Sequence, residues 1–345
     1  MSTGELSTIL VWGAVTAYAV ALIAFATDLA RRAEAAARPA REAAATDRVE
    51  AQLDGGAVVS GEGAVLARTR VAPGAVGGPG GAEDGADRWV GRALGIAMST
   101  TTLGLALHVV GAVLRGVAAG RVPWANMYEF TLIGSLAAVV TFRVLCLRRD
   151  VRFLGTIVIG LSVVALGLGL AAFYVPADAV EPALQSYWLV IHVSIATIAT
   201  GLFTVAVAAS TLQLLKDSWE NASPRMLSPR WQVLGTLPSV RSLEALAFRV
   251  NAVGFVLWTF TVMAGAIWAE HAWGRYWGWD PKEVWSFVVW VVYAAYLHAR
   301  TTRGWSGRRA AWFVLVGYAT VIFNFTGVNL FFSGKHAYSG LPGED

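Results

Sequence analysis

Tryptophan is concentrated in one short stretch of the chain. Six of the 15 tryptophans fall in the 23 residues from Trp268 to Trp290, and the centre of this stretch, residues 273–285, reads WGRYWGWDPKEVW. Tryptophans that form a belt at a membrane interface are spread over many helix ends, whereas these are crowded on one loop. Flat apolar ligands bind aromatic side chains by stacking and by burial of area. The stretch therefore predicts that Trp273, Trp277 and Trp279 form a platform for a large flat ligand.

Histidine is the second residue type that could do chemistry here. The chain has five, at positions 108, 192, 271, 298 and 336. Neutral imidazole is the usual axial ligand of haem iron, although a role in helix packing is the alternative for each histidine inside a membrane. His192 and His336 flank the tryptophan stretch in the sequence. If the elements bring this pair to the side of the tryptophans, the set suits a planar metalloporphyrin with both histidines on the iron.

The end of the tryptophan stretch also has a purely structural explanation. Asp280 suits the N-cap of a following helix, Pro281 suits the first helical position, and Glu283 completes a capping box. From these residues alone we expect no catalytic role for Asp280. Arg275 and Lys282 are either solvated loop charges or partners for an acidic group of the ligand.

Composition indicates that membrane-spanning helices position these residues. The 345 residues are 56% hydrophobic and 14% charged, with a mean hydropathy of +0.55, whereas a soluble domain carries about 25% charge. This excludes an ordinary soluble enzyme and a disordered protein. The net charge of +4 is scattered, so we expect no nucleic acid partner, and the single cysteine, Cys146, excludes an internal disulfide or a CxxC pair. We predict an all-α, multi-pass protein of the lipid bilayer.

Eight segments are long and apolar enough, or nearly so, to cross a bilayer core of about 30 Å as helices. The seventh is short unless its first turn is included. This predicts a polytopic helical bundle of about eight transmembrane helices. The segments are Leu6–Thr27, Trp89–Leu114, Met127–Leu147, Phe153–Phe173, Tyr187–Leu215, Val250–Glu270, Val284–Ala299 and Ala310–Phe332.

The positive charges predict the orientation, because Lys and Arg collect in cytoplasmic loops. With the N-terminus outside, all but five of the 27 Lys and Arg residues fall on the cytoplasmic side. Both termini and the tryptophan stretch are then extracytoplasmic, and we expect the plasma membrane as the location. The five exceptions are Arg115, Arg121, Arg275, Lys282 and Lys335.

Three regions differ in composition. Residues 1–30 contain the first transmembrane helix. Residues 31–88 are rich in Ala and Gly and nearly lack aromatics, so we expect a cytoplasmic linker, helical near Arg31–Gln52 and otherwise disordered. Residues 89–345 form the main membrane domain, with the tryptophan-rich external loop at 268–285. A second cytoplasmic loop, Asp217–Arg249, is expected to include an interfacial helix within the run Val240–Phe248.

This topology sorts the histidines by depth. His192 lies in the outer part of the fifth span and His336 follows the last span on the outside, so both share the side of the tryptophans. His298 lies about 25 Å along the seventh helix, in the inner half, and serves either a second haem or an entry site. His108 is the only other intramembrane histidine, and pairing it with His298 requires a shifted helix boundary. His271 adjoins the tryptophan loop and is expected at its rim.

Together these residues resemble the CcsA/ResC (System II) family of cytochrome c biogenesis, within the haem-handling superfamily marked by the tryptophan-rich WWD motif. The motif is complete at Trp273–Glu283, and the resemblance runs from about Trp89 to Gly340. Further blocks that match the family are Asn126–Glu129, Leu184–Trp188, His192–Ser194, Trp285–Phe287, Tyr296–Thr301, Gly327–Leu330 and Gly334–Tyr338.

The resemblance implies a ligand set and a cofactor, haem b. By it, His192 and His336 hold an external haem, and His298 holds a transmembrane haem whose second ligand comes from a ResB-like membrane subunit. His108 stays a candidate iron ligand by depth alone. The motif implies cofactor contacts for the following residues: Trp273, Trp277, Trp279, Asp280 and Trp285.

The resemblance also implies an activity. Haem b would be carried to the extracytoplasmic face and presented there for thioether attachment to the CxxCH segment of apocytochrome c. The reaction would be that of a holocytochrome c synthase, or haem lyase, acting as a complex with the ResB-like subunit and supplied by a thiol-reducing system. Two other functions share some of these features: a haem exporter or chaperone without ligation activity, and a di-haem electron-transfer membrane subunit.

Overall fold

The computed structural model describes residues 1–54, 80–177, 186–221 and 228–336. In these ranges the chain is helical and has no strand, which confirms the all-α membrane bundle. Each predicted span corresponds to a helix or, for the last, to a helix with its short continuation. The helices are α1 (Thr3–Asp54), α2 (Gly80–Ala119), α3 (Met127–Arg148), α4 (Gly155–Ala172), α5 (Tyr187–Glu220), α6 (Val240–Trp273), α7 (Pro281–Thr302), α8 (Arg308–Ile322) and α9 (Val328–Phe331).

Seven helices in the described ranges are long and apolar enough to cross a membrane. The seventh predicted span, which is α7, is less apolar than these seven, and it packs against α6 and α8 within the bundle. A π-helical turn, Phe323–Gly327, joins α8 to α9. Short 3-10 helices occupy Arg152–Leu154 and Pro229–Thr236.

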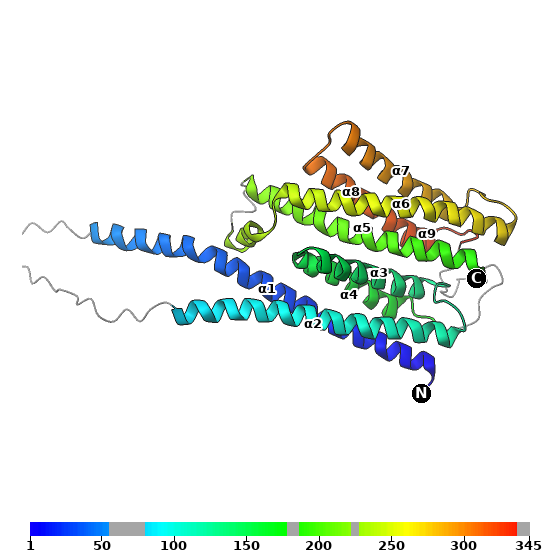
Figure 1. Ribbon diagram of the computed structural model, residues 1–345, viewed down its shortest axis with the longest axis horizontal. Helices are drawn as coiled ribbons and strands as arrows, with labels where there is room; N and C mark the ends of the chain where they lie inside the picture. The colour runs from blue at the N-terminus through cyan, green and yellow to red at the C-terminus, as the bar shows by residue number, and fades with distance from the viewer. Residues whose placement is uncertain (55–79, 178–185, 222–227, 337–345) are drawn as a thin grey trace, which may run out of the picture.

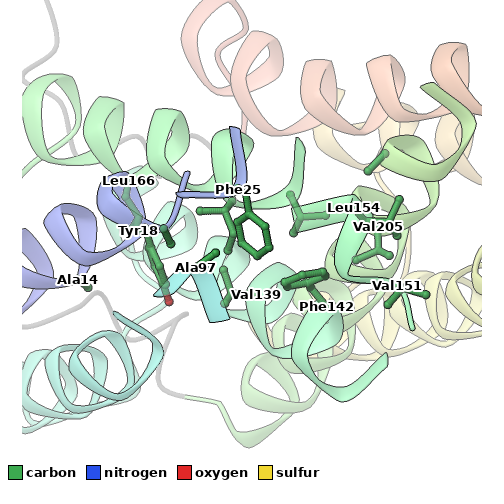
Figure 2. Close-up of a cluster of buried hydrophobic side chains, with 14 of the residues drawn as sticks. Ala14, Tyr18, Phe25, Ala97, Val139, Phe142, Val151, Leu154, Leu166 and Val205 are labelled. Atoms are coloured by element: carbon green, nitrogen blue, oxygen red, sulfur yellow. The ribbon is translucent and has the colours of Figure 1, made fainter. Parts of the chain in front are cut away.

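The helices form two packed groups that share α5. Figure 1 shows α1 and α2 side by side along one edge, α3 and α4 in the middle, and α5 to α8 along the other edge. The first core, shown in Figure 2, brings together Tyr18 and Phe25 of α1, Phe142 of α3 and Leu166 of α4. The second core joins α5, α6, α7 and α8 and fixes the helices that carry the candidate site.

Stacked aromatic rings hold α5 against α7 in the second core. The rings of Phe203 and Tyr293 lie parallel, with centroids 3.9 Å apart. Trp258 of α6 packs on the same Phe203 and donates its indole N–H to the Ser286 carbonyl oxygen at 3.1 Å. Burial of such side chains contributes roughly 1.5–3 kcal/mol each. The start of α5, the end of α6 and the start of α7 are therefore held at one end of the bundle, which is also the end of the N-terminus (Figure 1).

A buried carboxylate fastens α2 to α3 at this same end. Asn126 caps α3 by accepting a hydrogen bond from the Glu129 amide. The Glu129 side chain is fully buried between two arginines: Arg115 Nε lies 2.8 Å and an Arg121 guanidinium nitrogen 2.7 Å from its carboxylate oxygens. The predicted block at residues 126–129 is thus a helix start tied to the preceding helix and loop.

Two helix boundaries differ from the predicted ones. α6 begins at Val240, so the run Val240–Phe248, expected to be an interfacial helix, forms its first turns. Ser239 caps this start of α6. Glu244 forms an ion pair of 3.0 Å with Arg300 of α7, so its buried carboxylate has a partner of opposite charge. At the other end of the chain, α1 continues to Asp54 and α2 begins at Gly80. The remainder of the predicted linker, residues 55–79, lies outside the described residues.

Candidate functional site

A cavity of about 500 Å³ lies among α3, α4, α5, α6, α7 and α8, at the end where the tryptophan stretch joins α6 to α7. Its wall is largely apolar. Both His192 and His336 line it, together with Trp268, Trp277 and Lys282. The two histidines that the sequence pairs, which lie 144 residues apart in the chain, are therefore brought to one cavity.

His192 projects from the second turn of α5 toward α6. Its Nδ1 donates a hydrogen bond to the main-chain carbonyl oxygen of Thr261 at 2.8 Å. This leaves Nε2 with no hydrogen-bond partner among the described residues. The ring lies against Gly265, where an added Cβ would come within 2.7 Å of His192 Cε1. Glycine at position 265 is thus what lets the imidazole fit between the two helices.

His336 reaches the cavity from the segment after α9. Its Nδ1 donates to Asp280 Oδ1 at 2.8 Å, and the side chain is 16% exposed. Its ring lies edge-on to Trp273 and Trp268, at centroid distances of 4.8 and 5.4 Å. As with His192, Nε2 has no hydrogen-bond partner among the described residues. Each cavity imidazole therefore has Nδ1 fixed and Nε2 free, which is the usual state of a metal-binding histidine.

Asp280 both caps α7 and holds the segment that carries His336. Its carboxylate accepts a hydrogen bond from the Lys282 amide, and Glu283 completes the predicted capping box. The same carboxylate accepts the His336 bond and a 2.7 Å bond from the Lys335 amide. Gly334 packs against it so closely that a Cβ there would overlap its oxygen. The sequence predicts the cap, but nothing in it indicates a partner 56 residues away.

The pKa of the Asp280 carboxyl is lowered to about 2. Burial alone would raise it, but the hydrogen bond and charge of His336 and the two backbone N–H groups stabilise the ionised form more strongly. Asp280 is therefore a carboxylate at neutral pH, and it can accept all of these hydrogen bonds at once.

The motif tryptophans lie in different surroundings. Trp277 lines the cavity. The ring of Trp273 lies edge-on to the rings of His336 and Trp268. Trp279 is 77% exposed, has a left-handed backbone with φ of 58°, and contacts Trp277 with its ring. Trp285 packs on Phe323. A non-glycine residue with positive φ is uncommon, and such residues cluster at functional sites. The backbone of the loop is therefore strained at Trp279, where the side chain is exposed.

Trp268 is an aromatic residue of the cavity that sequence reasoning did not single out, and it contacts both histidines. It is almost fully buried at the end of α6, and it lines the cavity. Its ring is parallel to that of His192, at 9° and a centroid distance of 6.2 Å, and it also contacts His336. The sequence feature that could have identified Trp268 as a cavity residue is its place at the start of the tryptophan-rich stretch.

The two candidate cations of the loop lie in different surroundings. Lys282 lines the cavity, and its ammonium donates to the carbonyl oxygen of Asn324 at 2.7 Å and to Asn329 Oδ1 at 3.2 Å. Arg275 is exposed, with its guanidinium packed over Gly278. Only Lys282 is therefore placed to meet an acidic group inside the cavity.

The other three histidines are outside this cavity. His108 is fully buried, donates from Nε2 to the Leu132 carbonyl oxygen at 2.9 Å and has Nδ1 3.3 Å from the Tyr18 hydroxyl, so both ring nitrogens are used. His298 is exposed near the end of α7. His271 is also exposed and lies beside Glu270. The described ranges contain no group of three or more His, Cys, Asp or Glu side chains that would hold a metal ion.

Known proteins are similar to this chain over the region that contains the cavity histidines. A family model described as cytochrome C assembly protein covers residues 124–336. The cytochrome c biogenesis protein CcsA of Parasynechococcus marenigrum is 35% identical over an alignment of 255 residues, and the alignment covers 67% of this chain and 82% of that protein. The protein of the same name from Chlamydomonas reinhardtii is 32% identical over 240 residues, 67% of this chain and 65% of that protein.

A solved structure shows the same fold. The cytochrome c haem lyase CcmF superposes on 94% of this chain with a TM-score of 0.58 and 15% identity, and this chain spans 47% of its length. The family match at residues 124–336 contains His192, the whole tryptophan loop and His336. The chain therefore belongs to the cytochrome c assembly protein family, and the relatives it resembles at 32–35% identity are CcsA proteins.

Proposed function

We propose that this chain binds haem b at the extracytoplasmic end of its bundle, with His192 and His336 as axial ligands, and presents it for attachment to apocytochrome c. Its family and relatives support a role in cytochrome c maturation. The observation that carries the haem site is the pair of imidazoles on one cavity, each with Nδ1 held by the protein and Nε2 free.

The other residues of the cavity fit a porphyrin. The wall is mostly apolar and includes the indoles of Trp268 and Trp277, which suit a flat aromatic macrocycle. Lys282 is a basic side chain in this wall, and its ammonium form suits a propionate. Burial of apolar area stabilises such a complex by roughly 25 cal/mol per Å², so the apolar wall favours binding and the two histidines and the lysine favour one orientation.

The chain contributes positioning to the reaction. When bound, haem supplies two vinyl groups, each of which takes up one cysteine S–H so that a C–S and a C–H bond form without net electron transfer. His192 and His336 would hold the haem iron, and the apolar wall would exclude water. Alignment of reactants in this way can remove several kcal/mol of a barrier, up to about 7–11 kcal/mol for well-aligned intramolecular reactions. The histidine of the CxxCH segment would replace one of the two imidazoles.

A ResB-like subunit would complete the assembly. His298 is exposed on α7, and the described residues place no second histidine beside it. A transmembrane haem at His298 therefore needs its other ligand from a partner subunit. Thiol-reducing proteins would keep the CxxCH cysteines as thiols, because Cys146 is the only cysteine of this chain and lies at the far end of α3 from the cavity.

The experiment that separates this proposal from a haem exporter measures covalent product. The purified chain with its ResB-like partner is supplied with haem and a reduced CxxCH peptide, and the peptide mass and the haem absorbance of the peptide are recorded. We expect a peptide that carries covalent haem, and we expect the His192→Ala/His336→Ala double variant to form none. The matched control is His271→Ala, an exposed imidazole at the same end that does not line the cavity. Haem transfer to the peptide without a thioether bond would refute the ligation activity.

A further inference from the structure

The two cavity histidines have hydrogen-bond partners of different charge. His336 donates to the carboxylate of Asp280, and His192 donates to the neutral carbonyl oxygen of Thr261. Both bonds are 2.8 Å long. The difference between the two sites is therefore the charge of the acceptor and not the length of the bond.

The charge of that acceptor changes how strongly the opposite ring nitrogen binds a metal. A carboxylate at Nδ1–H pulls on the proton, so negative charge shifts to the ring and Nε2 becomes a better electron donor. A carbonyl oxygen does the same to a smaller degree. Loss of such an outer partner typically lowers metal affinity by about 10- to 100-fold.

The Asp280 carboxylate also fastens the chain segment on which His336 lies. This segment follows α9 and is not helical, so by itself it would position a side chain less firmly than α5 positions His192. Both carboxylate oxygens are used: Oδ1 accepts from His336 and from the Lys282 amide, and Oδ2 accepts from the Lys335 amide. Helix capping explains only the bond from Lys282, because a cap needs no contact with residues 334–336. The carboxylate is 4% exposed, which protects these bonds from water.

We infer that Asp280 is a positioning residue that makes His336 the stronger of the two axial ligands, and that the His192 position is the exchangeable one. The inference deepens the proposed haem site and rests on it. It assigns the entry of a competing ligand, such as an incoming imidazole, to the side of the ring plane held by α5.

The test compares single variants of the full chain in complex with its ResB-like partner. His192→Ala is expected to retain haem as a five-coordinate species that binds added imidazole, whereas His336→Ala is expected to retain at least tenfold less haem. Asp280→Asn keeps the cap, because Asn and Asp serve equally at the N-cap, but removes the charge. We expect it to raise the midpoint potential of the bound haem and to lower haem retention by about 10- to 100-fold.

A double-mutant cycle shows whether Asp280 acts through His336. The effect of Asp280→Asn should persist in the His192→Ala background and vanish in the His336→Ala background. The matched control is Glu270→Gln, which removes an exposed carboxylate 3.2 Å from the His271 ring; it should leave the potential unchanged.

Three results overturn the inference. The first is equal haem loss from His192→Ala and His336→Ala, or a greater loss from His192→Ala. The second is a potential in Asp280→Asn that matches Glu270→Gln. The third is a wild-type complex without haem, which defeats the proposed site itself and is thereby distinguished from the first two.

Discussion

Gly265→Ala places a methyl group where the His192 ring now lies. An ideal Cβ at this position would be 2.7 Å from His192 Cε1 and 2.9 Å from His192 Nδ1. Carbon atoms in contact prefer about 3.5–4.0 Å, so the ring must move by nearly 1 Å. Because the clash includes Nδ1, the movement also breaks the bond to the Thr261 carbonyl oxygen that fixes the ring.

Overpacking of other protein cores destabilises the fold by about 1–3 kcal/mol, and we expect a free-energy cost in this range for Gly265→Ala. If the ring escapes by rotating away from the cavity, that free energy is subtracted from haem binding. A change of 1.4 kcal/mol is a factor of ten in affinity, so we expect Gly265→Ala to bind haem about 10- to 100-fold more weakly. The fold should remain intact, because alanine is the better helix former.

The assay is haem titration of the purified complex, followed by absorption, with thermal unfolding as the check on folding. The matched control is Gly167→Ala on α4, where an added Cβ meets nothing within 4 Å. The control should bind haem as the wild type does and unfold at the same or a slightly higher temperature. Wild-type haem affinity in Gly265→Ala would refute the placement of His192 beside the cavity.

Three further predictions concern the loop and the end of the bundle. Lys282→Met should lower haem affinity by about tenfold or more, because a hydrogen bond to a charged group contributes about 1.5–3 kcal/mol, whereas Arg275→Met should leave a haem titration unchanged; equal effects would contradict the different placement of the two cations. Trp277→Ala should weaken haem binding in the same titration and Trp279→Phe should not, since only Trp277 lines the cavity; the reverse order would point to an external platform. Glu129→Gln should destabilise the fold by about 3–5 kcal/mol, seen as a lower unfolding temperature in detergent, because it removes the only carboxylate that pairs with the fully buried Arg115 guanidinium among the described residues. An unfolding temperature equal to that of the exposed-site variant Glu270→Gln would contradict this.

The helices and their order were predictable because their determinants are local. Spans of about 20 apolar residues identify membrane helices, and Asp280 with Pro281 and Glu283 identifies the start of α7. The early start of α6 at Val240 was not predictable in this way. Its first turns carry Arg241 and Glu244, and the partner that accommodates Glu244 is Arg300 on another helix.

The sequence predicted that His192 and His336 would share one site, and both line the same cavity, but it did not predict the residues that hold them. His192 and His336 stood out by residue type and by their expected side of the membrane. Their hydrogen-bond partners, Thr261 and Asp280, lie 69 and 56 residues away along the chain. No periodicity or spacing reports contacts of that range. Likewise, nothing in the sequence indicated that Trp277 lines the cavity, whereas Trp279 has a left-handed backbone and is 77% exposed.

The most direct measurement of the central claim is the electron paramagnetic resonance spectrum of the ferric haem in the purified complex. Two imidazole ligands make the iron low-spin, so we predict a low-spin signal in the wild type and in His271→Ala. The signal from this site should be lost in His192→Ala/His336→Ala, while any signal from a haem at His298 remains. An unchanged low-spin signal in the double variant would contradict ligation by His192 and His336.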